Sequence, residues 1–96
     1  MLDDKVIGNL KKIVRSKIKD NSYKLFIFGS RAKNVNRKFS DVDLGILGPK
    51  PVSSKAIIDI EEQFENSDIP YRIDLVDFYG ATDNFKTNAM KNMINI

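Results

Sequence analysis

The residues with the clearest chemical potential are two aspartates, Asp41 and Asp43, two positions apart in an apolar-alternating run. In a β-strand, residues at i and i+2 project from the same face, so these two carboxylates would lie side by side. Val42 and Leu44 would then point the other way, into a core. Because adjacent carboxylates repel one another and resist ionising together, the pair is typical of a divalent-metal site.

A Gly29-Ser30 turn precedes this pair and follows the apolar run Lys24–Phe28. Glycine lets a phosphate approach the backbone closely, a serine hydroxyl can donate a hydrogen bond, and free N–H groups at a helix N-terminus attract anions. The stretch therefore suggests metal-assisted phosphoryl chemistry. Four basic residues crowd the loop between the turn and the aspartates, where they would neutralise phosphate charge: Arg31, Lys33, Arg37 and Lys38.

A third acid, Asp74, stands in the apolar run Tyr71–Val76. An acid inside such a strand is unexpected unless it is paired or meets a cation. Two interpretations stay open. Asp74 either forms a salt bridge with Arg72 or a helix lysine, or it is the third carboxylate of one cluster. The second interpretation requires its strand to lie beside the strand that carries Asp41 and Asp43.

Hydrophobic periodicity and capping residues predict the elements that must position these groups. The first helix takes Asp3 or Asp4 as its cap, and the later one takes Ser53 or Ser54. In chain order the predicted elements are a helix over Asp3–Lys19, a strand over Lys24–Phe28, a short helix over about Arg31–Lys33, a strand over Val42–Leu47, a helix over about Ser53–Glu65, a turn over Asn66–Pro70 and a strand over Tyr71–Val76.

The last segment, Asp77–Ile96, is predicted to be helical after a turn at Gly80, with Asp83 as a possible cap. We interpret its methionines as core filler rather than as a binding surface. Five apolar residues recur in this segment at helical spacing: Phe85, Ala89, Met90, Met93 and Ile94.

Composition narrows the chemistry. The 96 residues fit a single domain over 1–96 with one core. With neither cysteine nor histidine, a site would rest on carboxylates and a hard cation, Mg²⁺ or Mn²⁺. No apolar run approaches the roughly 20 residues that span a bilayer, and the N-terminus is not a secretory signal, so we expect a cytoplasmic protein without membrane contact. The net charge is only +3, and basic residues are concentrated in one loop instead of forming a broad basic surface. This distribution fits an anion site better than direct nucleic-acid binding.

If Asp41, Asp43 and Asp74 converge beside the turn, they can hold two cations about 3.5–4 Å apart. One cation would activate an attacking hydroxyl, and the other would bridge the nucleotide phosphates and steady the leaving pyrophosphate. Asp74 would help to ionise the acceptor hydroxyl. Gly29 and Ser30 would hold the β- and γ-phosphates, with the four basic residues of the loop neutralising their charge.

Three motifs stand in order along the chain: Phe28-Gly29-Ser30, Asp41-Val42-Asp43-Leu44 after a ten-residue gap, and later Ile73-Asp74-Leu75. With these motifs the sequence resembles the polymerase-β-type nucleotidyltransferase superfamily, and from about Val6 to the C-terminus its minimal nucleotidyltransferases. The resemblance implies an α/β (α+β) fold with a short mixed sheet of three to four strands flanked by about four helices. It also implies Mg²⁺, a nucleoside triphosphate such as ATP, and transfer of a nucleoside monophosphate to an acceptor hydroxyl.

Minimal members of this superfamily are commonly paired with a helical HEPN-domain toxin, which some of them adenylylate as antitoxins. The resemblance thus implies such a partner, and the sequence leaves open whether the chain forms a homo- or hetero-oligomer. One alternative is a non-catalytic, nucleotide-binding antitoxin or accessory subunit that occludes its partner. Another is transfer to a small molecule or an RNA end. The chain departs from its relatives at Asn34, where they typically have glycine, and at Lys33, where many have arginine.

Overall fold

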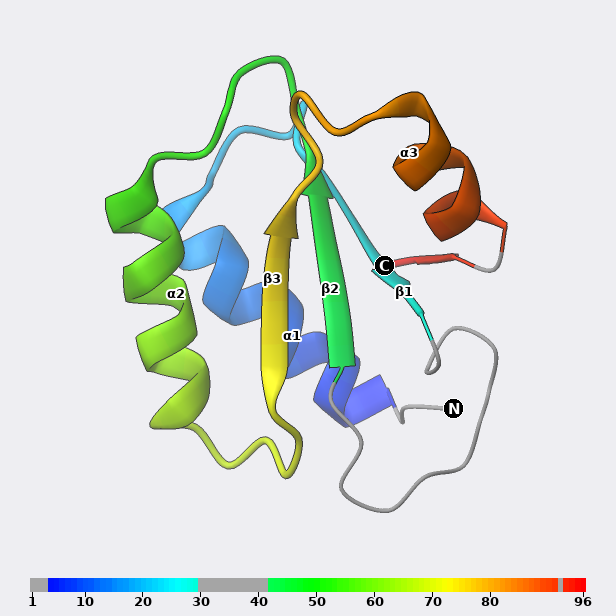
Figure 1. Cartoon of the computed structure of the whole chain (residues 1–96). Coiled ribbons are helices and arrows are strands. Elements are labelled where there is room, and N and C mark those ends of the chain that lie inside the picture. Colours follow the sequence, from blue (N-terminus) through cyan, green and yellow to red (C-terminus); the bar gives the residue numbers. More distant parts are fainter. Residues whose placement is uncertain (1–3, 30–41, 92) are drawn as a thin grey trace.

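The computed structural model describes residues 4–29, 42–91 and 93–96. The strands of these ranges form one mixed sheet in the order β3-β2-β1-β4 (Figure 1). β2 and β3 run parallel, whereas β1 pairs antiparallel with both of its neighbours. This arrangement confirms the predicted mixed α/β fold. The described elements are α1 (Asp4–Lys17), β1 (Lys24–Phe28), β2 (Val42–Leu47), α2 (Ser54–Glu65), β3 (Ile73–Asp77), α3 (Asp83–Met90) and β4 (Ile94–Asn95).

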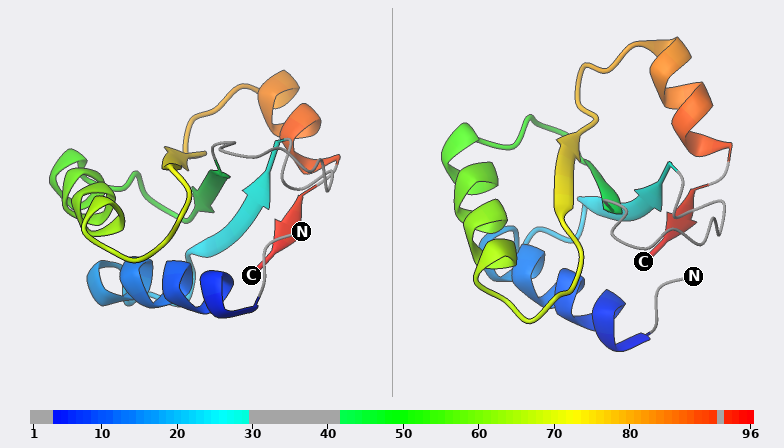
Figure 2. Two further views of the ribbon diagram at one scale, coloured as in Figure 1. Left: turned by 90° about the horizontal axis from the view of Figure 1, so that it is seen from below. Right: turned by 60° about the horizontal axis from the view of Figure 1, so that its bottom comes forward.

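Two helices, α1 and α2, cover one face of the sheet, and α3 lies on the other side (Figure 2). On the face towards α1 and α2, the alternate residues of β2 point into the core, as the i, i+2 pattern predicts. Their side chains are completely buried. They pack with the apolar stripes of the two helices, so this face carries the main core of the domain. Its fully buried members are Leu10, Val14, Ile27, Val42, Leu44, Ile46 and Ile60.

The second helix joins the parallel strands β2 and β3 and begins where its cap predicts. Ser53 is the N-cap residue, and its hydroxyl oxygen accepts a hydrogen bond from the backbone N–H of Ala56 at 3.2 Å. This bond satisfies one of the N–H groups that the first turn of a helix leaves unpaired. Ile60 and Phe64, one turn apart, are buried in the main core.

The opposite face carries a smaller aromatic cluster. Phe26 and Phe28 of β1 are buried there together with Phe78, which follows β3. The Phe26 and Phe78 ring centroids lie 4.8 Å apart, and those of Phe28 and Phe78 lie 5.1 Å apart, both in edge-to-face geometry. Ala89 of α3 packs on this cluster, which attaches the C-terminal helix to the sheet.

The C-terminal segment corrects the sequence-based prediction in two respects. The cap of α3 is Thr82 rather than Asp83, because the Thr82 hydroxyl accepts a hydrogen bond from the N–H of Phe85 at 3.2 Å. The helix ends at Met90 instead of continuing to Ile94.

Ile94 and Asn95 instead form the edge strand β4 against β1, with Ile94 paired to Ile27. Met93 packs on the aromatic cluster, which agrees with its interpretation as core filler, whereas Met90 is 40% exposed. The spacing of apolar residues at the end of the chain is compatible with a helix, but pairing with β1 makes Ile94 and Asn95 a strand.

The remaining boundaries follow the predictions closely. β1 and β2 have the predicted bounds, and β3 begins two residues later and ends one residue later than predicted. The short helix expected over Arg31–Lys33 and the cap residue Asp3 lie outside the described residues. Within the described parts of the chain, no helix combines the length and the apolar character needed to cross a membrane.

Candidate functional site

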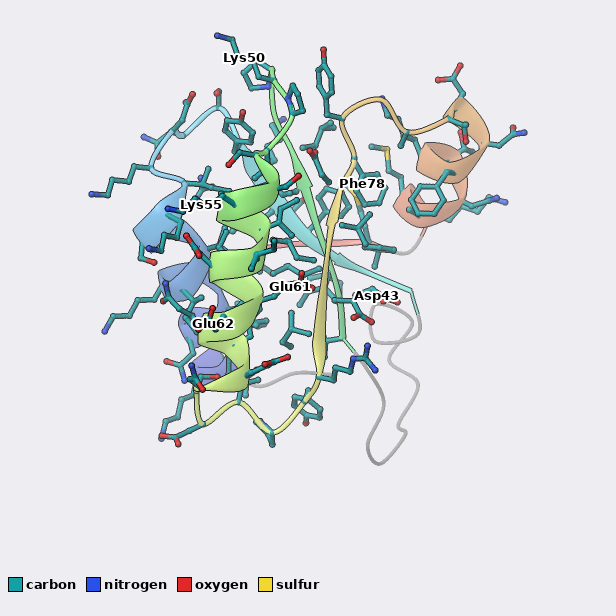
Figure 3. All side chains as sticks on the ribbon, turned by 60° about the vertical axis from the view of Figure 1, so that its left-hand side comes forward. Asp43, Lys50, Lys55, Glu61, Glu62 and Phe78 are labelled. Atoms are coloured by element: carbon teal, nitrogen blue, oxygen red, sulfur yellow. The ribbon has the colours of Figure 1, made fainter. Side chains whose placement is uncertain are left out.

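The strand register brings two of the predicted carboxylates together. Asp43 of β2 and Asp74 of β3 are Cα partners across the parallel pair, and Asp43 is also the partner of Phe28 in β1. Residues paired in this way project from the same face of a sheet, so both carboxylates lie on the face away from α1 and α2. Figure 3 shows Asp43 on the side of the sheet away from α2. The strand adjacency that a three-carboxylate cluster requires is therefore present.

Gly29, directly after β1, lies against the Asp43 carboxylate. Its φ of 78° falls in the left-handed region that favours glycine. A Cβ added at this position would collide with Asp43 Oδ2 and lie 3.4 Å from its Cγ. Only glycine permits this approach of backbone and carboxylate, so an anion held at the turn would lie beside whatever cation Asp43 binds.

Gly45, which the sequence analysis did not single out, makes room for the aromatic cluster on the face that carries the carboxylates. It lies one row further along the same face of β2, where it pairs with Phe26 of β1 and Val76 of β3. A Cβ at Gly45 would collide with the rings of Phe26 and Phe78. Because glycine weakens a strand interior, a glycine inside a buried strand is the signal that could have indicated this close approach.

Asp74 also contacts Arg72, as the other open interpretation anticipated. Arg72 Nε lies 3.7 Å from Asp74 Oδ1, with the arginine side chain 78% and the aspartate side chain 39% exposed. At this distance and exposure, an ion pair is worth only about 0–1 kcal/mol. The contact partly balances the charge of the carboxylate pair and leaves Asp74 accessible.

A hollow of about 320 Å³ opens beside Asp74, between the end of α2 and the start of β3. Its polar lining includes Glu61, Glu65, Tyr71 and Arg72 in addition to Asp74. Since β3 is the outermost strand of the described sheet, Asp74 can be approached from this side, whereas Gly29 lies on the β1 side of Asp43. The two sides of the carboxylate pair therefore offer separate places for two reactants.

A fourth aspartate, Asp77, ends β3 and serves the fold rather than this site. Its Cα partner in β2 is Ile46, whose side chain lies in the main core on the face towards α1 and α2. Its Oδ2 accepts a hydrogen bond from Val52 N at 2.8 Å, and its Oδ1 accepts one from Tyr79 N at 3.0 Å. Both carboxylate oxygens thus hold the loops that follow β2 and β3.

The remaining predicted site residues lie outside the described residues, and their roles stay predictions. No three acidic side chains within 4–29, 42–91 and 93–96 gather in a way that could hold a metal ion. Asp43 and Asp74 nevertheless supply the oxygen donors that a hard cation such as Mg²⁺ prefers, so the donor chemistry fits that ion. The residues outside the described ranges are Ser30, Arg31, Lys33, Arg37, Lys38 and Asp41.

Known proteins with this arrangement place the chain in a family. The model of the nucleotidyltransferase domain matches residues 7–96. A Haemophilus influenzae protein named probable protein adenylyltransferase MntA is 35% identical over 77 residues, which cover 80% of this chain and 66% of that protein.

Solved structures agree on the fold. A chain of a toxin–antitoxin crystal structure with AMP-PNP aligns with a TM-score of 0.75 at 18% identity, covering 98% of this chain and 72% of that one. A chain from the complex of a tri-AMPylated Shewanella oneidensis HEPN toxin with an MNT antitoxin aligns with a TM-score of 0.69 at 15% identity, covering 94% of this chain and 67% of that one. The domain model that matches residues 7–96 shows that the chain belongs to the nucleotidyltransferase domain family.

Proposed function

We propose that this chain is a Mg²⁺-dependent nucleotidyltransferase that transfers AMP from ATP to a hydroxyl of a partner protein, as the antitoxin of a HEPN/MNT pair. The observation that carries the proposal is the register of β2 and β3, which makes Asp43 and Asp74 neighbours on the face of the sheet away from α1 and α2. Membership of the nucleotidyltransferase domain family supports the reaction class.

The metal would be held by Asp41, Asp43 and Asp74, all oxygen donors suited to Mg²⁺ or Mn²⁺. Two such ions, when bound, would polarise the acceptor hydroxyl and the transferring phosphate and would stabilise the leaving pyrophosphate. The close approach of Gly29 to Asp43 supports this assignment, because it puts a backbone suited to phosphate next to a metal ligand.

The remaining residues would bind and orient the two reactants. The turn at Gly29 and Ser30 would hold the β- and γ-phosphates, with Arg31, Lys33, Arg37 and Lys38 opposing their charge. The acceptor would enter from the hollow on the β3 side, where Asp74 Oδ1 or Oδ2 would take the proton of its hydroxyl. The hydroxyl oxygen then bonds to the α-phosphorus, and the bond from that phosphorus to pyrophosphate breaks.

The proposal of a protein acceptor draws on two relatives. The Haemophilus influenzae protein carries the name of a protein adenylyltransferase, and the Shewanella oneidensis complex contains a HEPN toxin with AMP groups attached. The hollow beside Asp74 has a mostly polar rim and lies at the outer edge of the described sheet. A side chain presented by a docked protein suits such an open site.

The experiment is incubation of the purified chain with ATP and Mg²⁺, with and without the protein encoded beside its gene, followed by intact mass measurement of both. We expect the partner to gain one or more AMP units, and Asp43→Asn to abolish the gain. Glu62→Gln is the matched control, because Glu62 is an exposed acid on α2, across the sheet from Asp43 (Figure 3). No mass gain together with a stable complex would overturn transfer in favour of neutralisation by occlusion.

A further inference from the structure

We propose that the exposed ring of Phe85, backed by Phe28, stacks on the nucleobase of the nucleoside triphosphate. This inference rests on the proposed function and extends it from the phosphates to the base. It assigns a binding role to α3, which supplies none of the predicted phosphate or metal ligands.

Phe85 forms the open end of a line of aromatic rings. Its centroid lies 5.2 Å from that of Phe78 and 6.3 Å from that of Phe28. Phe28 and Phe78 are buried, whereas Phe85 is 44% exposed. The ring is therefore held from behind by two other rings and still presents aromatic surface to solvent.

The burial of the cluster does not account for this exposed ring. Ala81, Ala89 and Met93 already pack on the three buried phenylalanines and attach α3 to the sheet. Phe85 lies one helical turn before Ala89, so it shares the side of α3 that faces the cluster. A ring that is held against the cluster and is still partly exposed offers its aromatic face to a flat ligand.

The position relative to the carboxylates fits a nucleotide. Phe28 is the Cα partner of Asp43, and Gly29 follows it directly. One step of the sheet therefore separates the carboxylate from the ring that touches Phe85. A nucleoside triphosphate carries its charge at one end and a flat ring system at the other, so phosphates at Gly29 would leave the base to reach the rings.

Stacking on a ring face uses a property that all bases share, because each base has a π-face. We therefore expect Phe85 to strengthen ATP and GTP binding alike. Any selection between the two bases would come from other groups.

The test compares a ligand that carries a nucleoside with one that lacks it. Binding of α,β-methylene-ATP, whose α–β linkage cannot be cleaved, and of inorganic tripolyphosphate is measured by calorimetry in the presence of Mg²⁺. Phe85→Leu keeps an apolar side chain against the cluster but removes the ring face. We expect it to weaken binding of α,β-methylene-ATP by about tenfold, which is typical for the loss of one stacked base, and to leave the affinity for tripolyphosphate unchanged.

Tyr79→Leu is the matched control, because Tyr79 is a 50% exposed aromatic residue next to Phe78 with no ring contact to the cluster among the described residues. It should bind both ligands as the parent chain does. The inference is overturned if Phe85→Leu changes neither affinity, or if it weakens both ligands equally. A parent chain that binds neither ligand would instead overturn the proposed function, and the inference with it.

Discussion

The two faces of the sheet follow different rules. Towards α1 and α2, β2 presents Val42, Leu44 and Ile46, and every one of them is completely buried. On the other face the same strand presents Asp43 and Gly45. Asp43 lies beside a second aspartate, Asp74, and Gly45 lies against the rings of two phenylalanines of the aromatic cluster. Neither residue is a good choice for strand stability. The covered face therefore supplies the stability that lets the other face hold chemically useful but costly groups.

The largest expected effect tests the covered face. Leu44→Ala removes a fully buried side chain from the main core and leaves a cavity, so we expect the free energy of unfolding to fall by roughly 2–5 kcal/mol. Chemical denaturation followed by circular dichroism measures this change. A loss well below 1 kcal/mol would mean that the packing of this face does not dominate stability.

A smaller effect is expected from glycine replacement on the other face. Gly45→Ala forces a Cβ into the rings of Phe26 and Phe78, and overpacking of this kind costs roughly 1–3 kcal/mol. Gly8→Ala is the matched control in the exposed part of α1, where an added Cβ meets nothing within 4 Å. That control should stabilise by roughly 0.5–1 kcal/mol, since alanine favours a helix interior. Equal effects of the two replacements on thermal unfolding would contradict the proposed close packing at Gly45.

The smallest expected effect separates the two kinds of aspartate. Asp43→Asn removes the repulsion between two like charges, Asp43 and Asp74. The free energy of unfolding of the metal-free chain should therefore rise by up to about 1 kcal/mol, and its melting temperature should rise as well. The same variant should lose most of the stabilisation that Mg²⁺ and ATP give the parent chain.

Asp77→Asn should have the opposite sign in the metal-free chain. An amide can accept only one of the two hydrogen bonds from Val52 N and Tyr79 N, at a cost of about 1 kcal/mol. Differential scanning calorimetry of both variants at one pH makes the comparison. A melting temperature that falls by several degrees in Asp43→Asn would make Asp43 a structural residue.

Much of the fold follows from local patterns. The alternation of Val42, Leu44 and Ile46 sets both the strand and its buried face, and Ser53 marks the start of α2. These features depend on residues a few positions apart, which a sequence displays directly. The C-terminal segment did not follow because Ile94 pairs with Ile27, a partner far away in the chain.

The site divides in the same way. The sequence identifies Asp43 and Asp74 as candidates, but whether β3 lies beside β2 is a property of the whole sheet. Phe78 was not singled out, and Phe85 was noted only for its helical spacing, because the importance of both arises from ring contacts between β1, the segment after β3, and α3. No periodicity within one element reports such contacts.

The central claim is that Asp43 and Asp74 bind the same divalent cation. The most direct test is a titration with Mn²⁺ in the presence of α,β-methylene-ATP, followed by electron paramagnetic resonance, which distinguishes free from bound Mn²⁺. We expect Asp43→Asn and Asp74→Asn each to weaken Mn²⁺ binding by at least roughly tenfold. Loss of a residue that only orients a metal ligand already lowers metal affinity by about that factor, and loss of the ligand itself should lower it at least as much. Glu62→Gln should bind as the parent chain does. Parent-like Mn²⁺ binding by Asp74→Asn would contradict the claim.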